Sequence, residues 1–78
     1  MVYCDFIRKE NNHVLYAIGG TADDITGRIW IDLSNGKYDL LTPPKKTKVY
    51  DRHISRMIRL NMGSFLKGIC KPKMAYEI

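Results

Sequence analysis

The sequence predicts an α+β fold, an antiparallel β-meander of four to five strands with one α-helix packed on one face. Three observations predict it. Two pairs of segments alternate between apolar and polar residues around polar turns, one later segment has apolar residues at helical spacing, and a short final segment alternates again. The predicted order is β-β-β-β-α-β. A chain of 78 residues has room for one hydrophobic core, so we expect residues 1–78 to form a single small globular domain.

The first predicted hairpin joins residues 2–9 to residues 14–18. The polar stretch between them contains Asn11 and Asn12, and asparagine tolerates the left-handed conformation that a tight turn needs. Gly, Thr and Asp predominate in residues 19–27, which indicates a connector. The Asp23-Asp24 pair in this connector suggests a metal ligand or a general base. Such a pair in a turn more often accepts hydrogen bonds from backbone N–H groups, and we expect that role here.

The second predicted hairpin joins residues 28–33 to residues 37–41 across an Asn-Gly pair, a strong short-range hairpin signal. A two-residue loop would place Asp32 directly opposite Asp39, where like charges repel. A four-residue loop pairs Asp32 with Lys37 and keeps the same side chains on each face, because the change in loop length is even. We therefore expect the four-residue loop.

One α-helix is predicted over residues 48–62, after two prolines that end the preceding strand. Thr47 and Asp51 are the candidate N-cap residues. Gly63 suits the position after the helix, although a further turn could follow before Gly68. At about 100° per residue, one side of this helix collects the residues expected to pack on the sheet. These are Tyr50, Ile54, Met57, Ile58 and Asn61.

The end of the chain is predicted to return to the start of the sheet. Residues 74–78 alternate and indicate a fifth strand paired with the first, with Pro72 at its start or on an edge. Cys4 and Cys70 are the only cysteines, and we expect both to be reduced thiols. No signal peptide or membrane-spanning apolar run is visible, so a cytoplasmic location without membrane contact is the expectation. A monomer and a homodimer are both open.

Positive charge is segregated along the chain. Nine of the thirteen Lys and Arg residues lie between Lys45 and Lys73, where Asp51 is the only acid, so this stretch has a formal charge of +8. Three arginines at helical spacing also lie opposite the predicted packed side of the helix. We expect these arginines and the preceding lysines to form one basic surface. Its residues are Lys45, Lys46, Lys48, Arg52, Arg56 and Arg59.

No catalytic, metal or cofactor motif is present. Zinc ligands usually occur as C-x-x-C or H-x-x-x-H pairs, and neither spacing occurs among the cysteines and histidines. No serine lies in a G-x-S-x-G turn, and no glycine-rich phosphate loop is found. Cys70 with His53 is the only conceivable nucleophile–base pair, and a cysteine packed as a small apolar residue is much commoner. We therefore expect no enzymatic activity, no metal and no cofactor.

Two functions remain open. The first is a binding module whose basic helix face engages an acidic partner, either nucleic acid or protein, although a charge run on a small domain is often only a solvated face. The alternative is a protein–protein adaptor or inhibitor that uses apolar side chains on the sheet face away from the helix. Trp30, Leu41 and Ile7 are the residues expected on that face.

Overall fold

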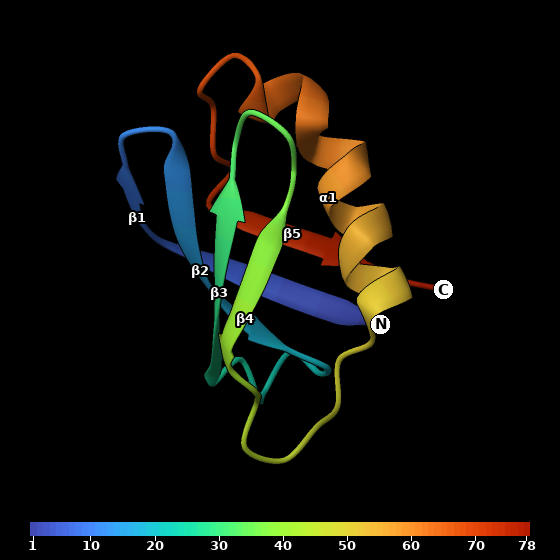
Figure 1. Ribbon diagram of the computed structural model, residues 1–78. Coiled ribbons are helices and arrows are strands. Elements are labelled where there is room, and N and C mark those ends of the chain that lie inside the picture. The colour runs from blue at the N-terminus through green and yellow to red at the C-terminus, as the bar shows by residue number, and fades with distance from the viewer.

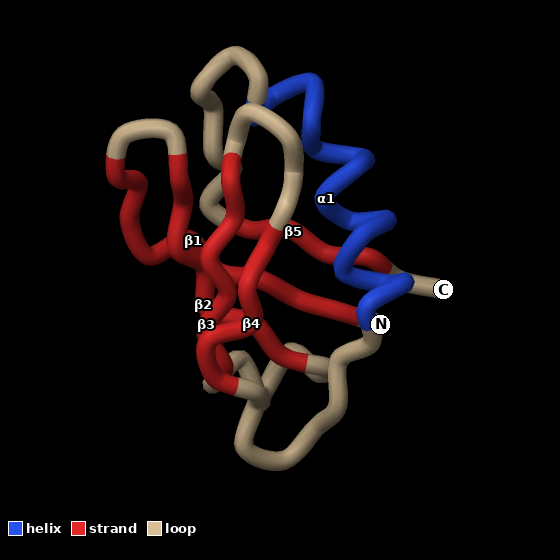
Figure 2. Tube along the Cα trace, in the orientation of Figure 1, coloured by secondary structure: helices blue, strands red, loops and turns tan.

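The computed structural model describes residues 1–78 and contains one five-stranded antiparallel sheet and one helix (Figures 1 and 2). The predicted α+β meander with a packed helix is confirmed. The elements are β1 (Val2–Glu10), β2 (His13–Gly19), β3 (Gly27–Asp32), β4 (Tyr38–Thr42), α1 (Asp51–Phe65) and β5 (Lys73–Tyr76).

The strands lie in the order β4-β3-β2-β1-β5, so the last strand pairs with the first, as predicted. The sheet is twisted, and β1 and β5 cross the direction of β3 and β4 in Figure 1. Helix α1 lies along one face and packs against β1 and β5. This arrangement leaves β4 and β5 as the two sheet edges and leaves the opposite face of the sheet without a covering helix.

Both hairpins have the turns that the sequence predicts. Asn11 has a φ of 52°, the left-handed conformation expected in the first turn. In the second hairpin, the Asp32 N–H donates to the Lys37 carbonyl at 2.8 Å, and Ile31 pairs with Tyr38. The four-residue loop is therefore confirmed. Its Gly36 has a φ of 75°, which favours glycine, and lies against Ile58 and Met62 of the helix.

The predicted helix boundaries are wrong by three residues at each end. The helix spans Asp51–Phe65, and its N-cap is Tyr50, whose side chain makes no capping hydrogen bond. Neither candidate N-cap residue, Thr47 or Asp51, takes that position. Gly63 lies inside the helix, and the chain leaves the helical region through Gly68, where φ is 76°. The further turn that the sequence left open is therefore present.

The core lies between α1 and the inner face of the sheet. It contains alternate residues of the strands and one side of the helix. Val14, Tyr16 and Ile18 of β2 belong to it, and the residues between them therefore lie on the outer face. Its members are Val2, Cys4, Val14, Tyr16, Ile18, Ile29, Ile31, Leu33, Ile54, Met57, Ile58, Phe65 and Met74.

Candidate functional site

The three helix arginines lie on the solvent side of α1. Arg52, Arg56 and Arg59 are all exposed, whereas Ile54, Met57, Ile58 and Asn61 on the opposite side are buried. Their immediate surroundings differ. Arg52 and Arg56 border a small cleft of about 170 Å³ toward β5, and Arg59 borders a depression beside the tip of the β3–β4 hairpin. The predicted arginine row is thus present on one helix. Arg52 and Arg56 lie toward β5, and Arg59 lies toward the β3–β4 hairpin.

The three predicted lysines lie on the segment of residues 43–50, which we call the lysine loop. It runs from the end of β4 to the first turn of α1 (Figure 1). Lys45, Lys46 and Lys48 are exposed. Together with the arginines they form the basic surface, Lys45, Lys46, Lys48, Arg52, Arg56 and Arg59.

Asp24 holds the lysine loop in place from the connector between β2 and β3. Its Oδ2 accepts hydrogen bonds from the Lys46 N–H at 3.0 Å, the Thr47 N–H at 2.7 Å and the Thr47 hydroxyl at 2.7 Å. Thr26 donates to Oδ1 at 3.0 Å and accepts from the Lys45 N–H at 2.8 Å. These bonds, first that from the Thr47 hydroxyl, lower the pKa of Asp24. The expected backbone-capping role is confirmed for Asp24.

Glycines allow the lysine loop to approach the sheet closely. The Gly20 N–H donates to the Thr47 hydroxyl at 2.9 Å, and a Cβ on Gly20 would lie 2.7 Å from the Lys48 carbonyl oxygen. A Cβ on Gly27 would lie 2.9 Å from the backbone nitrogen of Pro44 in the loop and 2.6 Å from the carbonyl oxygen of Thr42, which precedes the loop. Side chains at either position would therefore push the loop away from the sheet.

No side chain of the basic surface is neutralised within the chain. The structure contains three ion pairs, Arg8–Glu10, His13–Asp32 and Lys73–Asp5, and none includes a residue of the basic surface. The one nearby carboxylate of the helix, Asp51, accepts a hydrogen bond from the Tyr38 hydroxyl at 2.6 Å. The guanidinium and ammonium groups therefore face solvent without a carboxylate partner.

Three aromatic rings link the lysine loop to the arginines. Tyr50 meets His53 edge-to-face at 5.6 Å between ring centroids, and His53 lies 5.8 Å from Tyr76. Arg56 donates to the Tyr76 hydroxyl at 3.1 Å. The prediction that Tyr50 packs on the sheet is wrong, because 53% of its surface is exposed; as the N-cap it is still extended and does not follow the helical repeat.

His53 lies beneath this surface and is buried. Its Nδ1 lies 3.3 Å from the amino group of Met1. Burial is the main cause that lowers the pKa of His53, and the positive charges of the Met1 amino group, Arg52 and Arg56 act in the same direction.

The outer face of the sheet carries the residues of the alternative interface. Trp30 lies there but is only partly exposed, because it stacks on His13 with ring centroids 5.3 Å apart and planes 7° from parallel. Its cross-strand partner Leu15 is 8% exposed. Leu41 and Ile7 are 58% and 38% exposed, and both lie where the strand register shifts. The exposed apolar area is therefore at Leu41 rather than at Trp30.

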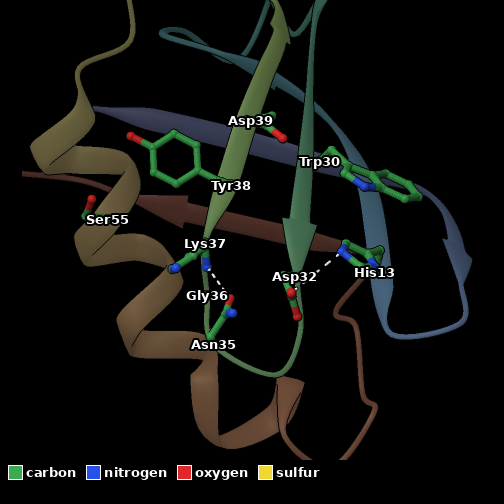
Figure 3. Close-up of a pocket in the computed structure, with 9 residues that line it drawn as sticks. All are labelled: His13, Trp30, Asp32, Asn35, Gly36, Lys37, Tyr38, Asp39 and Ser55. Carbon is green, nitrogen blue, oxygen red and sulfur yellow. Dashed lines mark hydrogen bonds and ion pairs between the residues drawn. The ribbon is translucent and has the colours of Figure 1, made fainter.

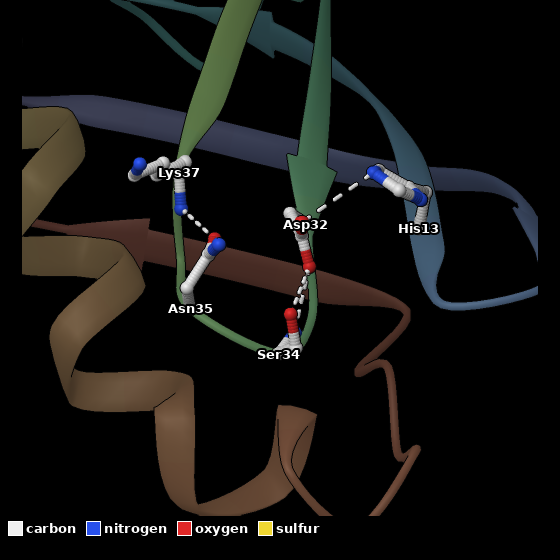
Figure 4. Close-up of polar contacts among 5 residues, drawn as sticks. All are labelled: His13, Asp32, Ser34, Asn35 and Lys37. Atoms are coloured by element: carbon white, nitrogen blue, oxygen red, sulfur yellow. Dashed lines mark hydrogen bonds and ion pairs between the residues drawn. The ribbon is translucent and has the colours of Figure 1, made fainter.

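A polar groove of about 620 Å³ wraps around the β4 edge at the second hairpin (Figure 3). Two of its polar residues, Asp32 and Asn35, accept hydrogen bonds within the hairpin loop. Asp32 Oδ1 accepts from the N–H and hydroxyl of Ser34, and Oδ2 lies 3.7 Å from His13 Nε2 (Figure 4). The Ser34 hydroxyl is the main cause that lowers the pKa of Asp32. These contacts explain how the loop keeps its shape.

The candidate nucleophile and base are not brought together. Both cysteines are free thiols, and no hydrogen bond joins Cys70 to His53. Burial raises the pKa of the Cys4 thiol to about 12 and also raises that of Cys70.

No group of three or more His, Cys, Asp or Glu side chains is placed to hold a metal ion. No helix is long and apolar enough to cross a membrane.

No family model, curated protein or solved structure matches this chain. The exposure of the six basic residues was predicted from the sequence, but Tyr50 as an exposed aromatic residue and Asp24 as the anchor of the lysine loop were not. The Asp-rich connector was a visible signal for a capping carboxylate, but its partner segment lies 22 residues or more along the chain.

Proposed function

We propose that this protein is a non-enzymatic binding module whose basic surface engages an acidic polymer, with nucleic acid as the favoured partner. One observation carries the proposal. All six cationic side chains are exposed on a single loop–helix segment, and none forms an ion pair within the chain. Unpaired cations at fixed spacing suit the regular charges of a phosphate backbone.

The scaffold beneath these cations supports the proposal. The arginines project from a helix whose other side is part of the core, and the lysine loop is tied to Asp24 through backbone N–H groups. The loop therefore loses little further backbone entropy when a partner binds. The arginine guanidinium also presents several N–H donors in a fixed plane, which matches phosphate oxygens.

A salt titration tests the proposal. Binding of a fluorescein-labelled nucleic acid should weaken steeply as salt rises, with a slope of about −0.9 log units per decade for each phosphate contacted on a duplex. Full use of the basic surface would give a slope of about −5. The measurement is fluorescence anisotropy between low and physiological salt. Absence of binding to nucleic acid and to heparin at low salt would contradict the proposal.

A second candidate function is a protein–protein adaptor or inhibitor that acts through the outer sheet face. Leu41 favours it, because 58% of its surface is exposed on the edge strand β4. Trp30 contributes less than the sequence suggests, since its ring already stacks on His13. A salt-insensitive complex lost on Leu41→Asp would support this second function. We place either function in the cytoplasm, which the two free thiols support.

A further inference from the structure

The lysine loop, together with Leu40, lines a groove that combines cations with apolar side chains. The groove has a volume of about 370 Å³, near the lower end of the range of roughly 300–1,000 Å³ usual for ligand pockets. Leu40, the two prolines, Val49 and Tyr50 supply apolar surface beside the three lysines. Its lining residues are Leu40, Pro43, Pro44, Lys45, Lys46, Thr47, Lys48, Val49 and Tyr50.

Tyr50 is the exposed aromatic residue of this groove. Its ring is positioned by the edge-to-face contact with His53, and its carbonyl oxygen accepts hydrogen bonds from the His53 and Ile54 N–H groups at 3.0 Å each. Although its ring and its backbone are both held, 53% of its surface is exposed. The ring of a bound molecule can therefore stack on the exposed part of Tyr50 without a rearrangement of the loop.

We propose that the basic surface binds single-stranded nucleic acid, with one base in the lysine-loop groove against Tyr50 and the flanking phosphates on Lys45, Lys46, Lys48 and Arg52. This inference rests on the proposed function and names its substrate class. The groove supplies an apolar, aromatic surface for the base, and the lysines supply charge for the backbone. The bases of a duplex are paired and stacked on each other, so they cannot enter the groove without being unpaired.

The path continues from Tyr50 to the helix arginines. Tyr50 contacts His53, and His53 lines the cleft that Arg52, Arg56 and Tyr76 border. The Tyr76 hydroxyl is fixed by Arg56 at 3.1 Å. A strand that leaves the groove past Tyr50 therefore meets two arginines and a second tyrosine. Alternating aromatic and cationic side chains along one path are typical of single-strand binding.

The test compares one sequence in two forms. Anisotropy is measured at the same salt with a labelled twelve-nucleotide single strand, as DNA and as RNA, and with the matching duplex. We expect the single strand to bind at least tenfold more tightly than the duplex. Tyr50→Ala should weaken single-strand binding by about tenfold, and Tyr50→Phe should retain it, because base–aromatic stacking needs the ring and not the hydroxyl. Duplex and heparin binding should change less than twofold in both variants.

Two controls keep the result interpretable. Leu66→Ala removes another exposed apolar side chain, 66% exposed near the end of the helix and outside the basic surface, and should leave binding unchanged. Tyr50→Leu preserves apolar volume without a ring, so it serves if Tyr50→Ala is poorly folded, and it should also lose single-strand binding. Intrinsic fluorescence of Trp30, the only tryptophan, reports folding in each variant.

A direct probe is photocrosslinking of an oligonucleotide that contains 5-iodouracil, with the crosslinked residue identified by mass spectrometry. A crosslink at Tyr50 supports the proposal. Equal affinity for single strand and duplex, or unchanged single-strand affinity in Tyr50→Leu, overturns it and leaves the proposed function standing. If neither nucleic acid form nor heparin binds at low salt, the proposed function itself fails.

Discussion

The two sides of this molecule carry charge in different ways. All three ion pairs of the chain lie on the outer face of the sheet: Lys73 bonds to Asp5 at 3.0 Å across β5 and β1, His13 faces Asp32, and Arg8 faces Glu10, whereas Arg28 on the same face has no acidic partner. On the loop–helix side, the six exposed cations of the basic surface have no acidic partner. A surface shaped only for solubility gains from the first arrangement. The second arrangement repels itself, and the acidic partner that we propose would offset this repulsion.

The largest expected effect is a loss of nucleic-acid affinity when the helix arginines, and not the cations of the sheet, are replaced. Replacing Arg52, Arg56 and Arg59 together by Gln should weaken binding to nucleic acid at 0.1 M salt by roughly two to three orders of magnitude and reduce the salt slope by about three. Gln keeps much of the side-chain length, so the fold should persist. Anisotropy titrations at several salt concentrations measure both quantities.

The matched control changes the charge by the same amount on the paired side. It replaces three exposed cations of the sheet by Gln: Arg8 and Lys73, which form ion pairs, and Arg28, which forms none. Binding should fall no more than a few-fold, through the loss of long-range attraction alone. Equal losses in the two triple variants would show that net charge, and not the basic surface, determines binding.

The next effect concerns how the basic surface is held. Gly20→Ala places a Cβ 2.7 Å from the Lys48 carbonyl oxygen, and the loop must move away from the sheet. We expect a loss of about 1–3 kcal/mol in the free energy of unfolding, as for other overpacked sites.

Gly63→Ala is the opposite case, because nothing lies within 4 Å of its Cβ on the exposed side of the helix. It should stabilise the protein by about 0.5–1 kcal/mol, measured by urea denaturation.

Asp24 provides a pH-dependent test of the same attachment. Its pKa is lowered in the folded state, chiefly by the Thr47 hydroxyl, so the folded state binds this proton less readily than the unfolded chain. The stabilisation is therefore complete above the ordinary aspartate pKa of about 3.9 and is lost as pH falls through the lower folded value. Asp24→Asn should destabilise the protein at neutral pH and flatten this acid dependence.

Hydrogen exchange gives the local measurement for this variant. Protection of the N–H groups of Lys45, Lys46 and Thr47 should fall in Asp24→Asn, because each depends on Asp24 directly or through Thr26. Asp23→Asn is the control, since Asp23 is exposed and accepts a hydrogen bond from the Thr21 hydroxyl and not from the lysine loop. If both variants behave alike, the loop is held by something other than the Asp24 carboxylate.

The paired side can be tested by removing its two candidate interface residues. Trp30→Ala should cost about 2 kcal/mol of stability, because the ring stacks on His13 and lies opposite the buried Leu15. Leu41→Ala should change stability by no more than about 0.5 kcal/mol, as expected for an exposed side chain. A Trp30 variant as stable as the natural protein would mean that the ring is free for a partner, and would strengthen the adaptor hypothesis.

The local sequence pattern was sufficient to predict the order of the strands and the helix and the loop of the second hairpin. The register there followed from the repulsion expected between Asp32 and Asp39, since side-chain parity is the same for both loop lengths, and Ile31 pairs with Tyr38 accordingly. The arginine row also followed from helical spacing alone, because helix geometry fixes which side chains share a face.

The start of the helix could not be predicted from local pattern. Thr47 suits an N-cap, but its hydroxyl already donates to Asp24 and accepts from Gly20. Asp51 is the first helical residue, and its carboxylate accepts the Tyr38 hydroxyl. Contacts with distant segments therefore occupy both candidate capping groups, the helix begins at Asp51, and Tyr50 stays extended. The exposure of Tyr50, and with it the groove, is thus a consequence of tertiary contacts.

The smallest expected effect concerns His53, which lies under the unpaired charges. Its pKa is lowered in the folded state, so the unfolded chain takes up a proton more readily. Stability should therefore fall as pH drops below the ordinary histidine pKa of about 6.5. Thermal melts between pH 7.5 and 5.5 should show this decline, and His53→Gln should reduce it. His13→Gln is the control, because its ring lies on the paired side beside Asp32. A polyanion bound to the basic surface would offset the positive charges of Arg52 and Arg56. It should therefore also reduce the loss of stability at low pH, whereas a polyanion bound elsewhere should not.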